Sequence, residues 1–199
     1  VLIDGANTDA FVAQLIQALS KQQPHPMLTA GMRKAFDAGI RRFMDAGALS
    51  LLQGQGTPPA PGPQLLQVSA QRFIERAELR DEVFGPSSLI VRCASVDDVH
   101  QVLDAVGGSL TVTLWGADED TAENRALVRS ATQIAGRVLF AGVPTGVAVT
   151  AAQQHGGPWP SSTAPMSTSV GDAALERFLR PVCLQDAPAW LLARGGVPC

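Results

Sequence analysis

The most informative positions of the chain are Asp81-Glu82-Val83-Phe84-Gly85-Pro86, which lead into the apolar run Leu89-Ile90-Val91. A Gly-Pro pair is a turn signal, and the residue before a proline is driven out of the helical region. The sequence therefore predicts a rigid loop that carries Glu82 and Phe84 into a strand. Such a loop could offer a carboxylate to ligand hydroxyls and an aromatic face to a planar ring. The alternative is an ordinary helix-to-strand connection with an exposed Glu and a buried Phe.

Apolar runs alternate with helical patterns on both sides of this loop. Strands are predicted at residues 64–68, 89–94, 110–115 and 137–141, and helices at residues 72–79, 95–106 and 120–135. Ser95 with Asp98 is typical of a capping box, and Gly107 and Gly136 each close a predicted helix. Apolar strands joined by helices of this size favour parallel pairing with right-handed crossovers. The sequence therefore predicts an α/β fold with three α/β/α layers around a mostly parallel sheet.

Two further helices are predicted before the first of these strands. Apolar side chains within residues 11–19 share one helical face, and Thr29 can cap a second helix that runs to Gly47. The Gly- and Pro-rich residues 53–63 then form a surface loop. The run Gln53-Gly54-Gln55-Gly56 is not a dinucleotide-binding motif, because a third glycine is missing and the prolines that follow prevent a helix.

Composition excludes several classes of function. The 199 residues carry a formal net charge of -3, with no basic cluster suited to nucleic acid and no apolar run long enough to span a bilayer. No secretory signal is recognisable. Cys93, Cys183 and Cys199 are widely spaced and odd in number, and the histidines are scattered, so neither a disulfide framework nor a metal site is predicted. The expected location is the reducing cytoplasm, without nucleic-acid or membrane partners.

Three ordered blocks of sequence connect the chain to a known family. Residues 82–86 carry the pattern E-x-F-G-P, and a second block runs from Phe140-Ala141-Gly142-Val143-Pro144-Thr145-Gly146-Val147 through residues 155–160 to residues 167–171. The third block is Arg177-Phe178-Leu179-Arg180-Pro181-Val182-Cys183-Leu184-Gln185. In these blocks the chain resembles the NAD(P)-dependent aldehyde dehydrogenase superfamily. It is most similar to the 2-oxoglutarate semialdehyde (2,5-dioxopentanoate) dehydrogenase branch, which also includes some fatty-aldehyde dehydrogenases.

The resemblance implies which part of such an enzyme this chain represents. Members of the family are much longer, with a cofactor domain upstream and a nucleophilic cysteine just before the position of Val1. Residues 1–170 would then be the C-terminal part of the catalytic domain. Residues 171–199 would be a terminal helix, strand and tail that form an oligomerisation arm. No catalytic nucleophile, general base or oxyanion-stabilising Asn is expected here, so the resemblance implies that the isolated polypeptide is inactive.

The resemblance also assigns site residues. Glu82 would hydrogen-bond the hydroxyls of the nicotinamide ribose, and Phe84 would pack beside the nicotinamide of NAD or NADP. The residues that would line the substrate tunnel are Pro144, Thr145, Gly146, Val147 and His155. From the residues alone, the glycine-containing loop could equally be a tight turn without a ligand, and His155 could have a surface or packing role. Cys93 lies in an apolar strand and is expected to be a buried, unreactive thiol.

For the whole enzyme the resemblance implies covalent catalysis. A cysteine thiolate attacks the aldehyde, hydride passes to NAD(P)+, and an activated water releases the carboxylate. The expected substrate is 2-oxoglutarate semialdehyde, although neither the aldehyde nor the choice between NAD and NADP can be read from these residues.

The end of the chain predicts assembly. In the family, C-terminal strands extend a sheet in a neighbouring subunit, so residues 182–185 are expected to form a strand that makes a homo-oligomer. From the residues alone, this segment could equally be a loose terminal tail. Two alternatives for the whole chain also stay open. The chain could be a non-catalytic oligomerisation or binding module that keeps the fold, or a short non-enzymatic paralogue.

Overall fold

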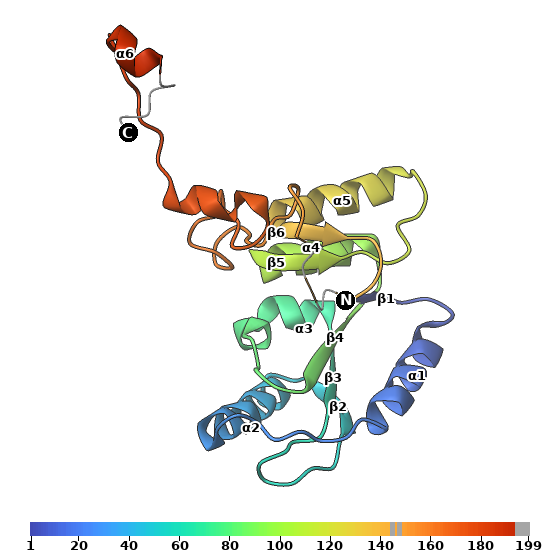
Figure 1. The fold of residues 1–199 in the computed structure, drawn as a ribbon. Coiled ribbons are helices and arrows are strands. Elements are labelled where there is room, and N and C mark those ends of the chain that lie inside the picture. Colours follow the sequence, from blue (N-terminus) through green and yellow to red (C-terminus); the bar gives the residue numbers. More distant parts are fainter. Residues whose placement is uncertain (144–145, 147–148, 194–199) are drawn as a thin grey trace.

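Strands and helices alternate along most of the chain, as an α/β fold requires. The computed structural model describes residues 1–143, 146 and 149–193 (Figure 1). The strands are β1 (Leu2–Ile3), β2 (Leu49–Gln53), β3 (Gln64–Ser69), β4 (Ser87–Cys93), β5 (Ser109–Thr113) and β6 (Ala135–Leu139). The α-helices are α1 (Thr8–Ser20), α2 (Ala30–Asp45), α3 (Ala70–Glu75), α4 (Val96–Val106), α5 (Ala122–Ile134) and α6 (Ala189–Leu192). The 3-10 helices are η1 (Ala77–Arg80) and η2 (Asp172–Phe178).

The strands form two sheets. The larger sheet has the order β1-β4-β3-β2, in which β1, β4 and β3 are parallel and β2 runs antiparallel to β3. The smaller sheet pairs β5 with β6 in parallel. Helix α4 contacts both α3 and α5, so the helical layer connects elements of the two sheets. The predicted α/β fold with mostly parallel strands is confirmed, with the strands divided between two sheets.

Alternating side chains of β3 and β4 create two apolar surfaces. Leu66 and Val91 point into a core shared with α2, α3 and α4, whereas Leu65 and Ile90 point to the opposite face, which α1 covers. This division follows from the two-residue period of a strand. Figure 1 shows α1 on one side of β3 and β4 and α2 and α3 on the other. The central strands are therefore covered on both faces, in the predicted three layers.

The main core lies between the larger sheet and helices α2, α3 and α4. Its buried side chains include Phe36, Ile40, Phe43, Leu66, Val68, Phe73, Leu79, Val91, Cys93, Val99, Val102 and Leu103. Full burial of one Leu, Val or Phe side chain contributes about 1.5–3 kcal/mol. This packing is the main source of stability for the elements that hold the loop at residues 81–86.

Capping side chains fix two helix starts where the sequence predicts them. The Thr29 hydroxyl accepts a hydrogen bond from the Met32 amide at 3.1 Å at the start of α2. At the start of α4, the Ser95 hydroxyl accepts from the Asp98 amide at 3.2 Å, and the Asp98 carboxylate accepts from the Ser95 amide at 3.2 Å. This reciprocal pair confirms the capping box.

Two boundaries and one strand differ from the prediction. Residues 72–79 are not one helix, because α3 ends at Glu75 and η1 follows it. Helix α5 ends at Ile134, so Gly136 lies inside β6 rather than closing the helix. A Cβ at Gly136 would lie 2.0 Å from the Gly156 carbonyl oxygen, so this glycine permits close backbone packing instead. Strand β2 is an additional strand that the sequence analysis did not predict.

The C-terminal segment leaves the body of the protein. Figure 1 shows the chain running outward after η2 to α6. The strand predicted at residues 182–185 is not formed, because these residues pair with no strand among those described. A strand needs a neighbouring edge for its backbone hydrogen bonds, and this extended segment has none beside it in the described chain. The oligomerisation arm therefore stays a prediction. No helix of the described residues is long and apolar enough to cross a membrane.

Candidate functional site

The loop at residues 81–86 is held tightly against α2. A Cβ at Gly39 would lie 2.8 Å from Cγ1 of Val83, so the loop packs directly on the helix backbone at that position. Asp81 pairs with Arg42 of the same helix, with 3.5 Å between Oδ2 and Nη2. Gly85 has a φ of +147°, and a Cβ there would lie 2.3 Å from Cδ2 of Phe36. Only glycine meets both the backbone and the packing requirement at this position.

Backbone hydrogen bonds fix the exit of the loop at the amino end of β4. The Ser87 amide donates to the Gly85 carbonyl at 2.8 Å, and the Gln64 amide of β3 donates to the Pro86 carbonyl at 2.8 Å. The Ser87 hydroxyl also reaches the Val83 carbonyl at 3.5 Å. The loop is thus joined to a helix on one side and to two strands on the other. This confirms the rigid loop that the Gly-Pro pair predicts.

Glu82 and Phe84 project from this fixed loop into solvent. Glu82 is exposed, and Phe84 is 67% exposed, so the alternative of a buried Phe is wrong. Among the described residues, the Glu82 carboxylate makes no hydrogen bond or ion pair, so its oxygens are available as acceptors. The two side chains therefore offer an acceptor group and a flat ring at neighbouring positions.

Both side chains line a groove of about 500 Å³. Its floor is apolar and comes from elements far apart in sequence: Phe43 of α2, Leu66 of β3, Phe73 of α3, Val91 of β4, and Val102 and Val106 of α4. Its rim carries Arg80, Asp81 and Glu82. The Arg80 guanidinium is held by the carbonyls of Phe73 and Ile74, at 3.3 and 2.8 Å. A ligand with an apolar ring and hydroxyl groups would match this combination of floor and rim.

The predicted tunnel segment is only partly described. Pro144, Thr145 and Val147 lie outside the described residues. The Gly146 carbonyl accepts a hydrogen bond from Arg137 Nη1 of β6 at 2.9 Å. The segment follows the carboxyl end of β6, whereas the Glu82 loop precedes the amino end of β4. No described residue of this segment lines the groove at Glu82, so the structure does not bring the two predicted sites together.

His155 is bonded within its own part of the chain. Its Nδ1 lies 2.7 Å from Oγ of Ser169, and its amide donates to Oγ1 of the buried Thr168 at 2.9 Å. Beside it, a Cβ at Gly157 would lie 2.3 Å from the Ser109 carbonyl of β5, so this segment packs closely on the smaller sheet. His155 thus has the packing role that the sequence left open, and its contact with a substrate stays a prediction.

The two cysteines in the described chain differ sharply. Cys93 of β4 is fully buried, and burial raises the pKa of its thiol above the ordinary value. A thiol in such a site stays protonated and unreactive, which confirms the prediction. Cys183 is exposed, and both thiols are free. Within the described residues, no group of three His, Cys, Asp or Glu side chains could hold a metal ion.

Sequence reasoning missed the residues that hold the loop. Gly39 lies in the interior of α2, where glycine costs about 1 kcal/mol relative to alanine. A glycine at such a position indicates close packing by another segment, which is the signal that could have found the contact with Val83. Arg42 carried no such signal, because a basic residue near the end of a helix is common on any surface.

Two curated proteins match nearly the whole chain in sequence. The chain is 43% identical over 196 residues to alpha-ketoglutaric semialdehyde dehydrogenase 2 of Azospirillum brasilense, covering 97% of this chain and 37% of the relative. It is 35% identical over 188 residues to alpha-ketoglutaric semialdehyde dehydrogenase of Acinetobacter baylyi, covering 92% and 36%. The chain therefore spans little more than a third of the curated relatives it matches. No protein-family model matches it.

Solved structures share the fold at lower sequence identity. A salicylaldehyde dehydrogenase from Pseudomonas putida G7, complexed with salicylaldehyde, matches with a TM-score of 0.69 and 16% identity, covering 92% of this chain and 39% of that chain. An indole-3-acetaldehyde dehydrogenase in complex with NAD+ matches with a TM-score of 0.67 and 15% identity, covering 88% and 36%. Both likenesses extend across the two sheets and support one shared architecture.

Proposed function

This chain belongs to the aldehyde dehydrogenase superfamily, and we propose that it supplies the part of an NAD(P)-dependent enzyme that holds the nicotinamide end of the cofactor. For the whole protein we propose oxidation of 2-oxoglutarate semialdehyde to the carboxylate, because both curated relatives carry that activity in their names. The chain covers 37% of the first of these relatives, so further polypeptide would complete the active site.

The observation that carries this proposal is the exposure of Glu82 and Phe84 on a rigid loop above an apolar groove. Two oxygens of the Glu82 carboxylate can accept hydrogen bonds from the two neighbouring hydroxyls of a ribose. The Phe84 ring can pack against the nicotinamide and exclude water from one face of it. The residues present therefore fit the nicotinamide riboside portion of the cofactor.

Rigidity is what this loop would contribute to the reaction. When bound, NAD(P)+ supplies the hydride acceptor. Glu82 and Phe84 would fix the position of the ribose and of the ring, and correct positioning of reacting groups lowers a barrier by several kcal/mol. Because α2 and the strands hold the loop at both ends, this positioning needs no rearrangement of the loop on binding.

We further propose that the chain has no catalytic nucleophile of its own. The Cys93 thiol is buried and its pKa is raised, which disfavours the reactive thiolate. The aldehyde would reach a nucleophile on other polypeptide through a path lined by Pro144, Thr145, Gly146, Val147 and His155. The isolated chain is then inactive toward 2-oxoglutarate semialdehyde with either NAD+ or NADP+, and steady turnover by the purified chain would contradict this.

Binding of nicotinamide riboside tests the proposal without requiring catalysis. In an NMR titration of the purified chain, the riboside should shift the backbone signals of residues 82–85. Glu82→Gln should weaken binding by roughly tenfold, because a hydrogen bond to a charged group contributes about 1.5–3 kcal/mol. The control is Glu119→Gln, which changes the charge equally at an exposed position outside the groove. Equal weakening of binding by both variants would show that Glu82 has no specific role in binding the riboside.

A second candidate function is assembly through the C-terminal segment. Five apolar side chains there are strongly exposed: Leu175, Phe178, Leu179, Val182 and Leu184. We propose that residues 171–199 form an arm whose residues 182–185 pair with a sheet edge of a second copy, while residues 1–170 form the catalytic-domain portion. Unpaired strand edges favour such pairing. Removal of residues 172–199 should abolish self-association in sedimentation velocity, and unchanged association would exclude the arm.

The compartment we propose is the reducing cytoplasm. The free thiols of Cys93 and Cys183 support it, since both can persist without oxidation there.

A further inference from the structure

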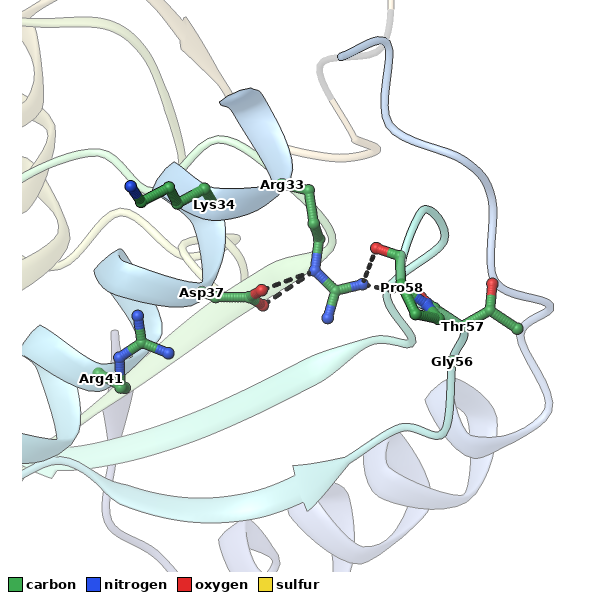
Figure 2. A pocket seen from close by; sticks show the side chains of 7 residues that line it. All are labelled: Arg33, Lys34, Asp37, Arg41, Gly56, Thr57 and Pro58. Carbon is green, nitrogen blue, oxygen red and sulfur yellow. Dashed lines mark hydrogen bonds and ion pairs between the residues drawn. The ribbon is translucent and has the colours of Figure 1, made fainter. Parts of the chain in front are cut away.

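A second groove lies on a different side of α2, between that helix and the loop that precedes β3. Arg33, Lys34 and Arg41 of α2 line it together with Gly56, Thr57 and Pro58, around a volume of about 540 Å³ (Figure 2). A neighbouring hollow of about 350 Å³ shares Arg33, Asp37, Arg41 and Gly56. We call these adjoining hollows the basic groove. We propose that the basic groove binds a small oxyanion, a phosphate or a carboxylate group.

Arg33 is oriented in advance for such a ligand. Its Nε donates to both carboxylate oxygens of Asp37, at 3.0 and 2.9 Å, and its Nη1 donates to the carbonyls of Thr57 and Pro58, at 2.9 and 3.0 Å. These bonds occupy Nε and Nη1 of the guanidinium. The other terminal nitrogen, Nη2, is joined by no dashed line in Figure 2 and makes no hydrogen bond with the described residues. Its two N–H groups remain in a fixed direction, so little side-chain entropy is lost when they meet an anion.

The charges of the groove favour an anion. Arg33, Asp37 and Arg41 follow one another at intervals of four residues on one face of α2, and Lys34 lies beside them. Three cationic side chains and one carboxylate line the groove, in a chain whose formal net charge is -3. Asp37 is already paired with Arg33 at 2.9 Å. Lys34 and Arg41 make no hydrogen bond or ion pair with the described residues, so their charges are available to an incoming ligand.

The wall opposite α2 is a closed and well-bonded turn. The amides of Thr57 and Ala60 donate to each other's carbonyls, at 2.9 and 3.0 Å, and the Met27 amide donates to the Pro59 carbonyl at 2.8 Å. A Cβ at Gly56 would lie 2.3 Å from the Ala60 carbonyl oxygen, so the turn has no room to collapse further. The basic groove is therefore preformed, which lowers the cost of binding.

This groove is separate from the proposed nicotinamide site. None of its lining residues lines the groove at Glu82. Gly39 and Arg42, which hold the Glu82 loop, lie on α2 at positions about a third to a half of a turn away from Arg33 and Asp37. Nicotinamide riboside carries a positively charged pyridinium ring and would be repelled by the basic side chains, whereas an oxyanion would be repelled by Asp81 and Glu82 at the other groove. The two grooves therefore favour ligands of different charge.

Titration with two probes tests the proposal. Inorganic phosphate and succinate are each added to the purified full chain at constant ionic strength, and binding is followed by NMR shifts of residues 33–41 and 56–58. The double variant Lys34→Gln/Arg41→Gln removes two unpaired charges without touching the bonds of Arg33. We expect it to weaken binding at least fivefold. Phosphate binding alone would assign a phosphate group, and succinate binding alone a dicarboxylate.

A charge-matched control separates a specific site from general attraction. Lys21→Gln/Arg129→Gln removes the same charge from exposed positions outside the basic groove and should leave affinity unchanged. Equal losses in the two double variants would overturn the proposal, as would the absence of shifts at residues 33–41 with both probes at 20 mM, roughly the limit of weak specific binding. Neither result would bear on the riboside titration, because that probe carries no phosphate.

Discussion

Gly85→Ala is the sharpest test of how the Glu82 loop is built. The φ of +147° at Gly85 lies where L side chains rarely occur, and an added Cβ would lie 2.3 Å from Cδ2 and 2.7 Å from Cε2 of Phe36. The backbone cost alone is about 1–3 kcal/mol. Forcing a methyl group against a buried ring adds about 1–3 kcal/mol. The variant should therefore lose about 3 kcal/mol or more of unfolding free energy.

Urea unfolding followed by circular dichroism measures this loss. With an m-value of about 2 kcal/mol per M, the midpoint should fall by roughly 1.5 M. Gly107→Ala is the matched control, since Gly107 also has a positive φ, of +71°, but nothing lies within 4 Å of its added Cβ. That control should lose only about 1 kcal/mol. Equal losses in the two variants would show that Phe36 does not fix the loop.

Four further predictions concern single side chains. Ser95→Ala should cost about 1 kcal/mol in urea unfolding, because it removes the acceptor for the Asp98 amide at the start of α4, and no loss would contradict the capping box. Thr168→Val should lower the unfolding free energy by about 1–3 kcal/mol, because Oγ1 of this buried residue accepts from the His155 amide and donates to the Val170 carbonyl. Removal of this hydroxyl should also change the NMR chemical shifts of the His155 ring. Cys93 should resist iodoacetamide in the folded protein while Cys183 reacts at once, and equal rates would contradict burial of Cys93. Burial raises the pKa of the Cys93 thiol in the folded state. The protonated thiol therefore stabilises the fold fully below the ordinary thiol pKa of about 9, and this contribution is lost as the pH rises above that value. Cys93→Ser should accordingly reduce the fall in unfolding free energy between about pH 8 and 10.

Local signals predicted the parts of the fold that depend on few residues. The Gly-Pro pair before Leu89 placed the loop and the strand after it, and the capping residues placed the starts of α2 and α4. The two-residue period of β3 and β4 then put side chains on both faces of the sheet, so helices on both sides followed.

Features that depend on distant contacts could not be predicted this way. Gly136 looked like a helix stop, but it is required by the Gly156 backbone, which packs on it from a later segment. Strand β2 has two adjacent apolar residues, Leu51 and Leu52, at a register shift against β3, which hides the alternation of a strand. Phe84 is exposed because Phe36 and Val83 fill the space beside α2. The spacing of residues in the sequence does not predict this packing.

The proposed role of Glu82 and Phe84 is to hold the nicotinamide end of the cofactor. Intermolecular nuclear Overhauser effects between nicotinamide riboside and the purified chain test it most directly. We expect contacts from the ring protons of the nicotinamide to the Phe84 ring, and from the ribose protons to the Glu82 side chain. Contacts confined to other residues, with none to Phe84, would contradict it.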